Sequence, residues 1–136
     1  MSLDPTSLQQ FIRMALQEDV REGDHTSLAC IPADALGKAR LLVKQEGILA
    51  GMPVAQAVFF EVDPDITFEP IMQDGDVMHP GDIAFRVEGK AISLLTAERL
   101  VLNCMQRMSG VATLTRQFVD AIAGTRAQVI DTRKTT

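Results

Sequence analysis

The side chains best suited to chemistry lie at the end of the sequence, in the run Thr132-Arg133-Lys134-Thr135-Thr136. This run follows residues 127–131, whose apolar centre predicts a buried strand. A planar guanidinium binds a carboxylate through two hydrogen bonds, and a lysine ammonium suits phosphate as a compact charge. The pattern therefore predicts a phosphate or carboxylate site at the carboxyl end of that strand. The alternative is a solvated basic tail.

A second group of polar side chains lies on the longest predicted helix, residues 94–108. Arg99, Asn103 and Gln106 follow one another along the face opposite its apolar side. They are candidates for binding an anion, and an ordinary solvated helix face is the alternative. Glu98 falls inside the apolar arc of the same helix. Because a buried carboxylate needs a cation or several donors, we expect Glu98 to be buried against a cation.

The other reactive side chain types form no recognisable site. His25 and His79 lack partners at metal-ligand spacing, and both are expected in loops. Cys104 lies on an apolar helix face and is expected in the core, and Cys30 is isolated. The carboxylates of the polar stretch 18–27 are typical of turn caps. The sequence therefore predicts no catalytic residue and no metal ligand.

Composition limits the function classes. The chain has 136 residues, 46% of them apolar, and a net charge of −5, which disfavours general nucleic acid binding. No apolar run is long enough to span a membrane. Two cysteines cannot build a disulfide framework, so a reducing cytoplasm is expected. The last 38 residues carry six basic side chains against Asp120 and Asp131, an asymmetry that suggests an anionic partner for this end.

Periodicity predicts mixed helices and strands. Ser7 and Gln10 have capping-box spacing, and the following apolar stripe predicts a helix to about residue 18. The elements expected next are strands at 38–44 and 48–50, a helix at 53–61 with Pro53 in its first position, turns at 74–76 and 80–82, and a strand at 83–87.

The last part is predicted to contain two helices and a strand. Ser109-Gly110 is expected to interrupt the helix at 94–108, and residues 111–122 form a second amphipathic pattern closed near Gly124. Its apolar face is expected to be exposed or covered by association. That face consists of Val111, Leu114, Phe118 and Ile122.

Several motifs together resemble one known family. They are ALQEDVREGDHTS (15–27), KQEGILAG (44–51), DGDVMHPGD (74–82), LLTAERLVLNCMQRMSGVATLTR (94–116) and DTRKTT (131–136). In this order they closely resemble the quinolinate phosphoribosyltransferases, the carboxylating nicotinate-nucleotide pyrophosphorylases of NAD biosynthesis. The resemblance extends over nearly the whole chain from Leu8. Leu100 departs from the pattern, because the family often has threonine after the arginine.

The resemblance implies an activity and a set of binding residues. The enzyme joins quinolinate to phosphoribosyl pyrophosphate, and the products are nicotinate mononucleotide, pyrophosphate and carbon dioxide, with magnesium as cofactor. It implies a homodimer in which Arg99 reaches quinolinate across the interface, while Thr132, Arg133 and Lys134 line the anionic pocket. The resemblance places the magnesium ligands outside this chain.

The resemblance also implies the domain organisation. Residues 1–109 are expected to form an α+β domain, an α/β sandwich-like unit with a small bent sheet of barrel-sandwich type. Residues 110–136 are expected to begin a C-terminal α/β barrel whose remainder the chain lacks, so the 136 residues alone are expected to be inactive.

Two alternatives stay open. A related pyrophosphorylase that acts on another base would show similar motifs. A non-catalytic lipoyl or biotinyl carrier would explain the segment 74–89, but a carrier needs a modifiable lysine at a hairpin tip. No lysine lies between Asp74 and Gly89.

Overall fold

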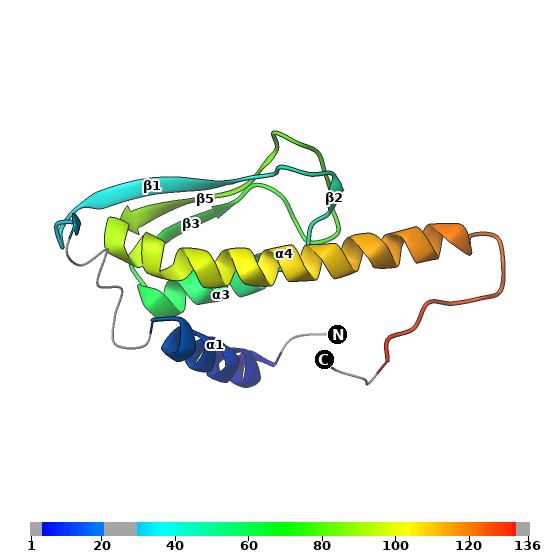
Figure 1. Ribbon diagram of the computed structural model, residues 1–136, viewed down its shortest axis with the longest axis horizontal. Helices are drawn as coiled ribbons and strands as arrows, with labels where there is room; N and C mark the ends of the chain where they lie inside the picture. Colours follow the sequence, from blue (N-terminus) through cyan, green and yellow to red (C-terminus); the bar gives the residue numbers. More distant parts are fainter. Residues whose placement is uncertain (1–3, 21–29, 133–136) are drawn as a thin grey trace.

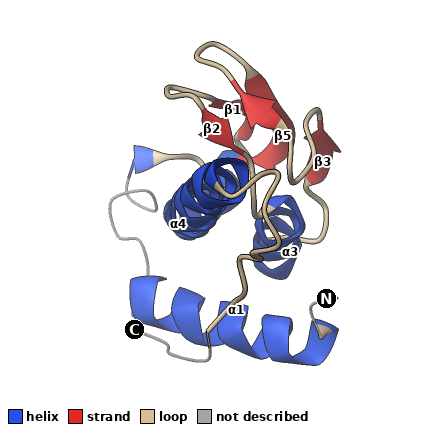
Figure 2. Cartoon of the chain, turned by 90° about the vertical axis from the view of Figure 1, so that its right-hand side faces the viewer, coloured by secondary structure: helices blue, strands red, loops and turns tan. Residues whose placement is uncertain are grey.

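A small antiparallel sheet, two helices packed on one of its faces, and a third helix on their far side make up three layers (Figure 1, Figure 2). The computed structural model describes residues 4–20 and 30–132. The elements in chain order are α1 (Pro5–Val20), β1 (Leu36–Leu42), β2 (Gly47–Ile48), α3 (Met52–Val62), β3 (Thr67–Pro70), β4 (Val77–Met78), β5 (Ile83–Lys90) and α4 (Ala91–Ala121). The predicted α+β class is confirmed, and the described residues close no barrel.

The sheet is antiparallel throughout. β5 lies in the centre between β1 and β3, and β2 pairs with β4 in a separate two-stranded ladder. The register between β1 and β5 shifts between Arg40 and Leu42, which bends the edge strand. The strands predicted at 38–44, 48–50 and 83–87 and the helix predicted at 53–61 are therefore present, with ends that differ by a few residues.

The core lies between the sheet and the helices α3 and α4. Phe59, Phe68 and Phe85 form an aromatic cluster with ring centroids 4.9–5.9 Å apart. Ala97 and Val101 bring α4 onto the same core, where both are almost fully buried. This packing fixes which face of α4 is available to solvent.

Helix α4 is one continuous helix of 31 residues, so the predicted interruption at Ser109-Gly110 is wrong. Ser109 is buried, and its hydroxyl accepts a hydrogen bond from the Ala50 N–H and donates one to the Ala50 carbonyl. Thr113 accepts a hydrogen bond from the Ile48 N–H at 2.8 Å. These tertiary contacts offset the low helix propensity of the Ser-Gly pair.

Helix α1 begins earlier than the sequence predicted. The Asp4 carboxylate accepts hydrogen bonds from the backbone N–H and the hydroxyl of Ser7, so Asp4 caps the helix and Ser7 lies inside it. These hydrogen bonds from Ser7 lower the pKa of the Asp4 carboxyl. The predicted apolar stripe is confirmed by Ile12, which is only 1% exposed.

Residues 127–131 do not form the predicted strand. After α4 ends, the chain turns back toward the side that carries α1, without regular secondary structure in residues 127–132 (Figure 1, Figure 2). Ile130 is 78% exposed. A strand needs a neighbouring strand to satisfy its backbone groups, and residues 127–131 are in neither of the two sheets that the structure describes.

Candidate functional site

Arg99 projects from the N-terminal half of α4 on the side away from the β-sheet. The buried residues Ala97, Leu100 and Val101 fix the rotation of the helix, and this rotation leaves the Arg99 side chain 72% exposed. Asn103 and Gln106 are also exposed, as the helical periodicity predicted. Arg99 is thus placed where a ligand can reach it.

One carboxylate contacts Arg99. Asp19 lies in the last turn of α1, and its Oδ1 accepts a hydrogen bond from Arg99 Nη1 at 3.0 Å. The Asp19 side chain is 25% exposed, so it is the more sheltered partner. A guanidinium has five N–H donors, so this contact leaves most of them available to an anion.

Packing and polar contacts hold α1 in the position that presents Asp19. Ile12 anchors the helix in the core. Glu61 of α3 accepts hydrogen bonds from Arg13 Nε at 2.6 Å and from Gln9 Nε2 at 3.0 Å. The hydrogen bond from Arg13, more than that from Gln9, lowers the pKa of the Glu61 carboxyl. The position of Asp19 is therefore set by a docked helix.

The contact made by Asp19 was not predicted from the sequence, because the polar stretch 18–27 indicated a loop. A signal was available, because Glu18 and Asp19 end a helix that the apolar stripe already predicted. Carboxylates are unfavourable at the negative end of a helix dipole, and such a position favours a nearby cation. The identity of that cation could not be read from the sequence, since Arg99 is 80 residues away.

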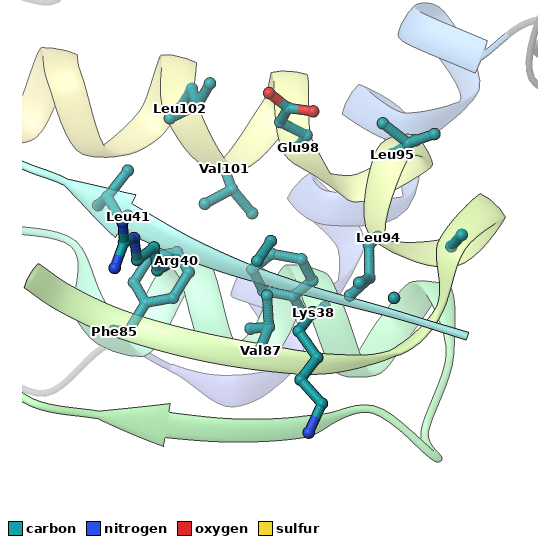
Figure 3. Close-up of a pocket in the computed structure, with 14 residues that line it drawn as sticks. Lys38, Arg40, Leu41, Phe85, Val87, Leu94, Leu95, Glu98, Val101 and Leu102 are labelled. Atoms are coloured by element: carbon teal, nitrogen blue, oxygen red, sulfur yellow. The ribbon is translucent and has the colours of Figure 1, made fainter.

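The prediction that Glu98 is buried against a cation is wrong. Glu98 is exposed and lies at the rim of a cavity of about 300 Å³ between α4 and the edge strand β1 (Figure 3). The buried stripe of α4 runs through Leu94 and Val101, and Glu98 lies beside this stripe, next to Leu102. Because β1 is an edge strand, the sheet ends there and the carboxylate reaches solvent.

The cavity itself has few polar groups. Figure 3 shows Leu94, Val101, Phe85 and Val87 between α4 and the strands, while the charged end of Lys38 extends away from them. Lys38 pairs with Glu88 at 2.9 Å. The described lining has no converging set of acids, bases or nucleophiles, and we therefore assign the cavity no catalytic role.

A second, wider groove of about 840 Å³ runs between residues 41–47 and the C-terminal half of α4. Leu114 lines this groove, and Val111, Leu114 and Phe118 are 54–64% exposed, so these three residues of the predicted apolar face are exposed in the single chain. Ile122, the fourth residue of that face, is half-buried.

The described residues show only the first residue of the basic run Thr132-Arg133-Lys134-Thr135-Thr136. Thr132 is exposed. Arg133, Lys134, Thr135 and Thr136 lie outside the described residues. From Arg99 to the end of α4 at Ala121 the helix extends about 33 Å at 1.5 Å per residue. Arg99 and the start of the C-terminal segment are therefore far apart along α4.

The remaining candidates show no assembled site. His79 Nδ1 lies 3.7 Å from Asp82 in a turn, and Cys30 is exposed. Partial burial raises the pKa of the Cys104 thiol, which agrees with its predicted place at the core. His25 and most of the loop 18–27 lie outside the described residues. Among the residues described, no three His, Cys, Asp or Glu side chains are placed to hold a metal ion, and no helix is long and apolar enough to cross a membrane.

Residues 24–109 match the family model for the N-terminal domain of quinolinate phosphoribosyl transferase. The chain belongs to this family. A quinolinate phosphoribosyltransferase (decarboxylating) 1b from Nicotiana tabacum is 46% identical over 129 residues, 94% of this chain and 36% of that protein. A probable nicotinate-nucleotide pyrophosphorylase (carboxylating) from Synechocystis is 35% identical, over 95% of this chain and 43% of that protein.

Solved structures show the same fold in this family. The crystal structure of NadC from Streptococcus pyogenes superposes with a TM-score of 0.94 at 38% identity, over 100% of this chain and 48% of that one. The chain thus spans about a third of the length of the first curated relatives and about half of this structure.

Proposed function

We propose that this chain forms the N-terminal part of an enzyme that transfers a phosphoribosyl group from phosphoribosyl pyrophosphate to quinolinate with loss of carbon dioxide. The observation that carries the proposal is the family match over residues 24–109. The names of the relatives from Nicotiana tabacum and Synechocystis give the same activity. The product would be nicotinate mononucleotide, a precursor of NAD.

The binding residues in this proposal are Arg99, Thr132, Arg133 and Lys134. Quinolinate carries two carboxylates, and the sugar donor carries a phosphate and a pyrophosphate, so the site must gather positive charge. The exposed guanidinium of Arg99 suits a carboxylate, since its planar fork donates two parallel hydrogen bonds. Lys134 suits a phosphate as a compact charge.

Arg99 is proposed to act on the active site of a second copy in a homodimer. The helix places Arg99 about 33 Å from the end of α4, after which the chain turns back toward the side that carries α1 (Figure 1). The proposal that a partner copy supplies the second group of cations rests on the resemblance to the family. The exposed guanidinium and the exposed Thr132 are compatible with this arrangement.

The role of these residues in the reaction is positioning and charge stabilisation. The quinolinate ring nitrogen bonds to the anomeric carbon of the ribose as pyrophosphate leaves with the electron pair of the broken bond. The 2-carboxylate then leaves as carbon dioxide, and the ring carbon takes up a proton. Fixing the carboxylates orients the nitrogen toward the sugar, and cations stabilise the developing negative charge. No residue of this chain is assigned as a nucleophile.

Magnesium and a cytoplasmic location belong to the same proposal for the whole protein. Magnesium prefers oxygen ligands and is often bound through substrate phosphates. The described residues form no cluster that fits it, so we derive no step through the ion. The cytoplasmic location is supported by the low number of cysteines, since two cannot build a disulfide framework.

The division into domains at residue 109 is proposed as well. The family model ends at 109, and the apolar side chains of α4 become exposed from Val111 onward. We assign residues 110–136 to the start of an α/β barrel. Because the chain belongs to this family, we no longer propose a lipoyl or biotinyl carrier. A carrier also gave no explanation for α4 and Arg99. A related enzyme with another base remains the second candidate.

The test is the activity of the whole protein that carries this sequence. With quinolinate and phosphoribosyl pyrophosphate, we expect nicotinate mononucleotide and pyrophosphate in equal amounts. Arg99→Ala should raise the KM for quinolinate about 100-fold, the loss expected for a bidentate charged contact of roughly 3 kcal/mol. The melting temperature should hardly change, because exposed ion pairs contribute little stability.

Arg107→Ala is the matched control, since Arg107 is another exposed arginine of α4 and has no assigned role. Its KM for quinolinate should equal that of the wild type. Equal KM values for Arg99→Ala and Arg107→Ala would contradict the role of Arg99. Turnover of a different pyridine or pyrimidine base, with none of quinolinate, would favour the second candidate.

A further inference from the structure

We propose that Asp19 is a positioning residue that holds the Arg99 guanidinium in the orientation in which it binds a substrate carboxylate. The inference rests on the proposed function and adds to it a residue from helix α1. Asp19 Oδ1 lies 3.0 Å from Arg99 Nη1, and the two residues are 80 positions apart in the sequence. Helix α1 thereby contributes to the binding group of α4.

The burial of the two side chains shows which one anchors the other. Asp19 is 25% exposed, whereas Arg99 is 72% exposed. Asp19 lies on a helix that Ile12 fixes in the core and that Arg13 ties to Glu61. Arg99 in contrast extends from α4 as a long flexible side chain. The carboxylate is therefore the fixed end of the pair.

The geometry leaves the guanidinium able to bind a second anion. One Nη1 hydrogen faces Asp19, and the remaining N–H donors include a pair that can form a bidentate contact. Fixing one end of the side chain before the substrate arrives reduces the rotamer freedom that is lost on binding. The effect expected from such preorganisation is about threefold to tenfold in affinity.

The charge of Asp19 acts in the opposite direction, because it reduces the attraction between Arg99 and an anion. Both groups face solvent, where salt screens this effect. An asparagine keeps an oxygen acceptor at the same place and removes the charge. The positioning role and the charge effect can therefore be separated by comparing Asp19→Asn with Asp19→Ala.

The experiment measures steady-state kinetics with quinolinate in the whole protein that carries this sequence. Asp19→Ala should raise the KM for quinolinate about fivefold, with kcat and the KM for phosphoribosyl pyrophosphate within twofold of wild type. Asp19→Asn should have a KM at or below that of wild type. In an Arg99→Ala background, Asp19→Ala should have no further effect, since the two residues act as a unit.

Glu18→Ala is the matched control. It removes the neighbouring, exposed carboxylate of α1 and leaves the Asp19–Arg99 and Arg13–Glu61 contacts intact. Its KM for quinolinate should not change. An unchanged or lower KM in Asp19→Ala, an equal rise in Glu18→Ala, or a further rise in the Arg99→Ala background would overturn the proposal.

A second measurement separates this inference from the proposed function. The Arg99 side-chain N–H signals in the NMR spectrum of the 136-residue chain, assigned with Arg99→Lys, should exchange faster with water in Asp19→Ala and not in Asp19→Asn. Unchanged exchange in Asp19→Ala would show that Asp19 does not hold Arg99. If the wild-type protein does not convert quinolinate, the proposed function fails and this substrate role fails with it, while the NMR result still decides the contact.

Discussion

Replacing Ser109 with alanine tests how the long helix holds the β2 segment. The Ser109 hydroxyl lies 3.0 Å from the Ala50 nitrogen and 3.2 Å from its carbonyl oxygen, and only 9% of Ser109 is exposed. Alanine removes both hydrogen bonds, so the N–H and the carbonyl of Ala50 lose the Ser109 hydroxyl as their partner. Each buried group left unsatisfied costs about 1–3 kcal/mol. Alanine recovers about 0.5 kcal/mol through its higher helix propensity.

The expected result is a free energy of unfolding that is lower by about 2 kcal/mol, with a melting temperature lower by roughly 8 °C. Urea unfolding of the 136-residue chain, followed by circular dichroism, measures the first quantity. Amide hydrogen exchange at Ala50 should become faster. Thr115→Ala is the control, because Thr115 is exposed on the same helix. If Ser109→Ala were as stable as Thr115→Ala, the two hydrogen bonds between Ser109 and Ala50 would not stabilise the fold and the reasoning would be refuted.

Two further changes test the turns around α3 and α4. Gly51→Ala should destabilise the chain by about 2 kcal/mol in urea unfolding, because Gly51 has φ of 104° and an added Cβ would lie 3.1 Å from the Met108 sulfur. Unchanged stability would contradict this conformation. The Ser93 hydroxyl, more than the Asp65 N–H, lowers the pKa of the Asp63 carboxyl below its usual 3.8. A lowered pKa in the folded state stabilises the protein above pH 3.8, and the gain is lost as pH falls through the lower value. Ser93→Ala should therefore cost about 1–2 kcal/mol near pH 7 and less below pH 3.8, whereas a loss that is independent of pH would refute the role of Asp63.

The helices and strands of the first hundred residues could be predicted because their signals are local. The apolar stripe of α1 and the alternation in β5 depend on residues a few positions apart. The exposed polar line of Arg99, Asn103 and Gln106 followed from the same periodicity. The proposed function came from the family motifs. The spacing of the residues alone was compatible with either an anion-binding site or an ordinary solvated surface.

The errors have a common cause. Ser109-Gly110 has low helix propensity, but the partner that stabilises it there is Ala50, 59 residues away. Glu98 fell in the apolar arc of a helical wheel, which cannot show that the sheet ends at β1. Residues 127–131 have the composition of a strand, and composition does not provide the neighbouring strand that pairing requires.

The sequence by itself determined most helices and strands of the first hundred residues, the surplus of basic side chains near the end and the family, since each of these is encoded in local patterns or in ordered motifs. Only the tertiary structure decided that Asp19 contacts Arg99, that Ser109 binds Ala50 and that Glu98 faces solvent. Each of these depends on how segments far apart in the chain pack against one another. Packing of this kind is decided by the whole core at once, and no short window of sequence contains it.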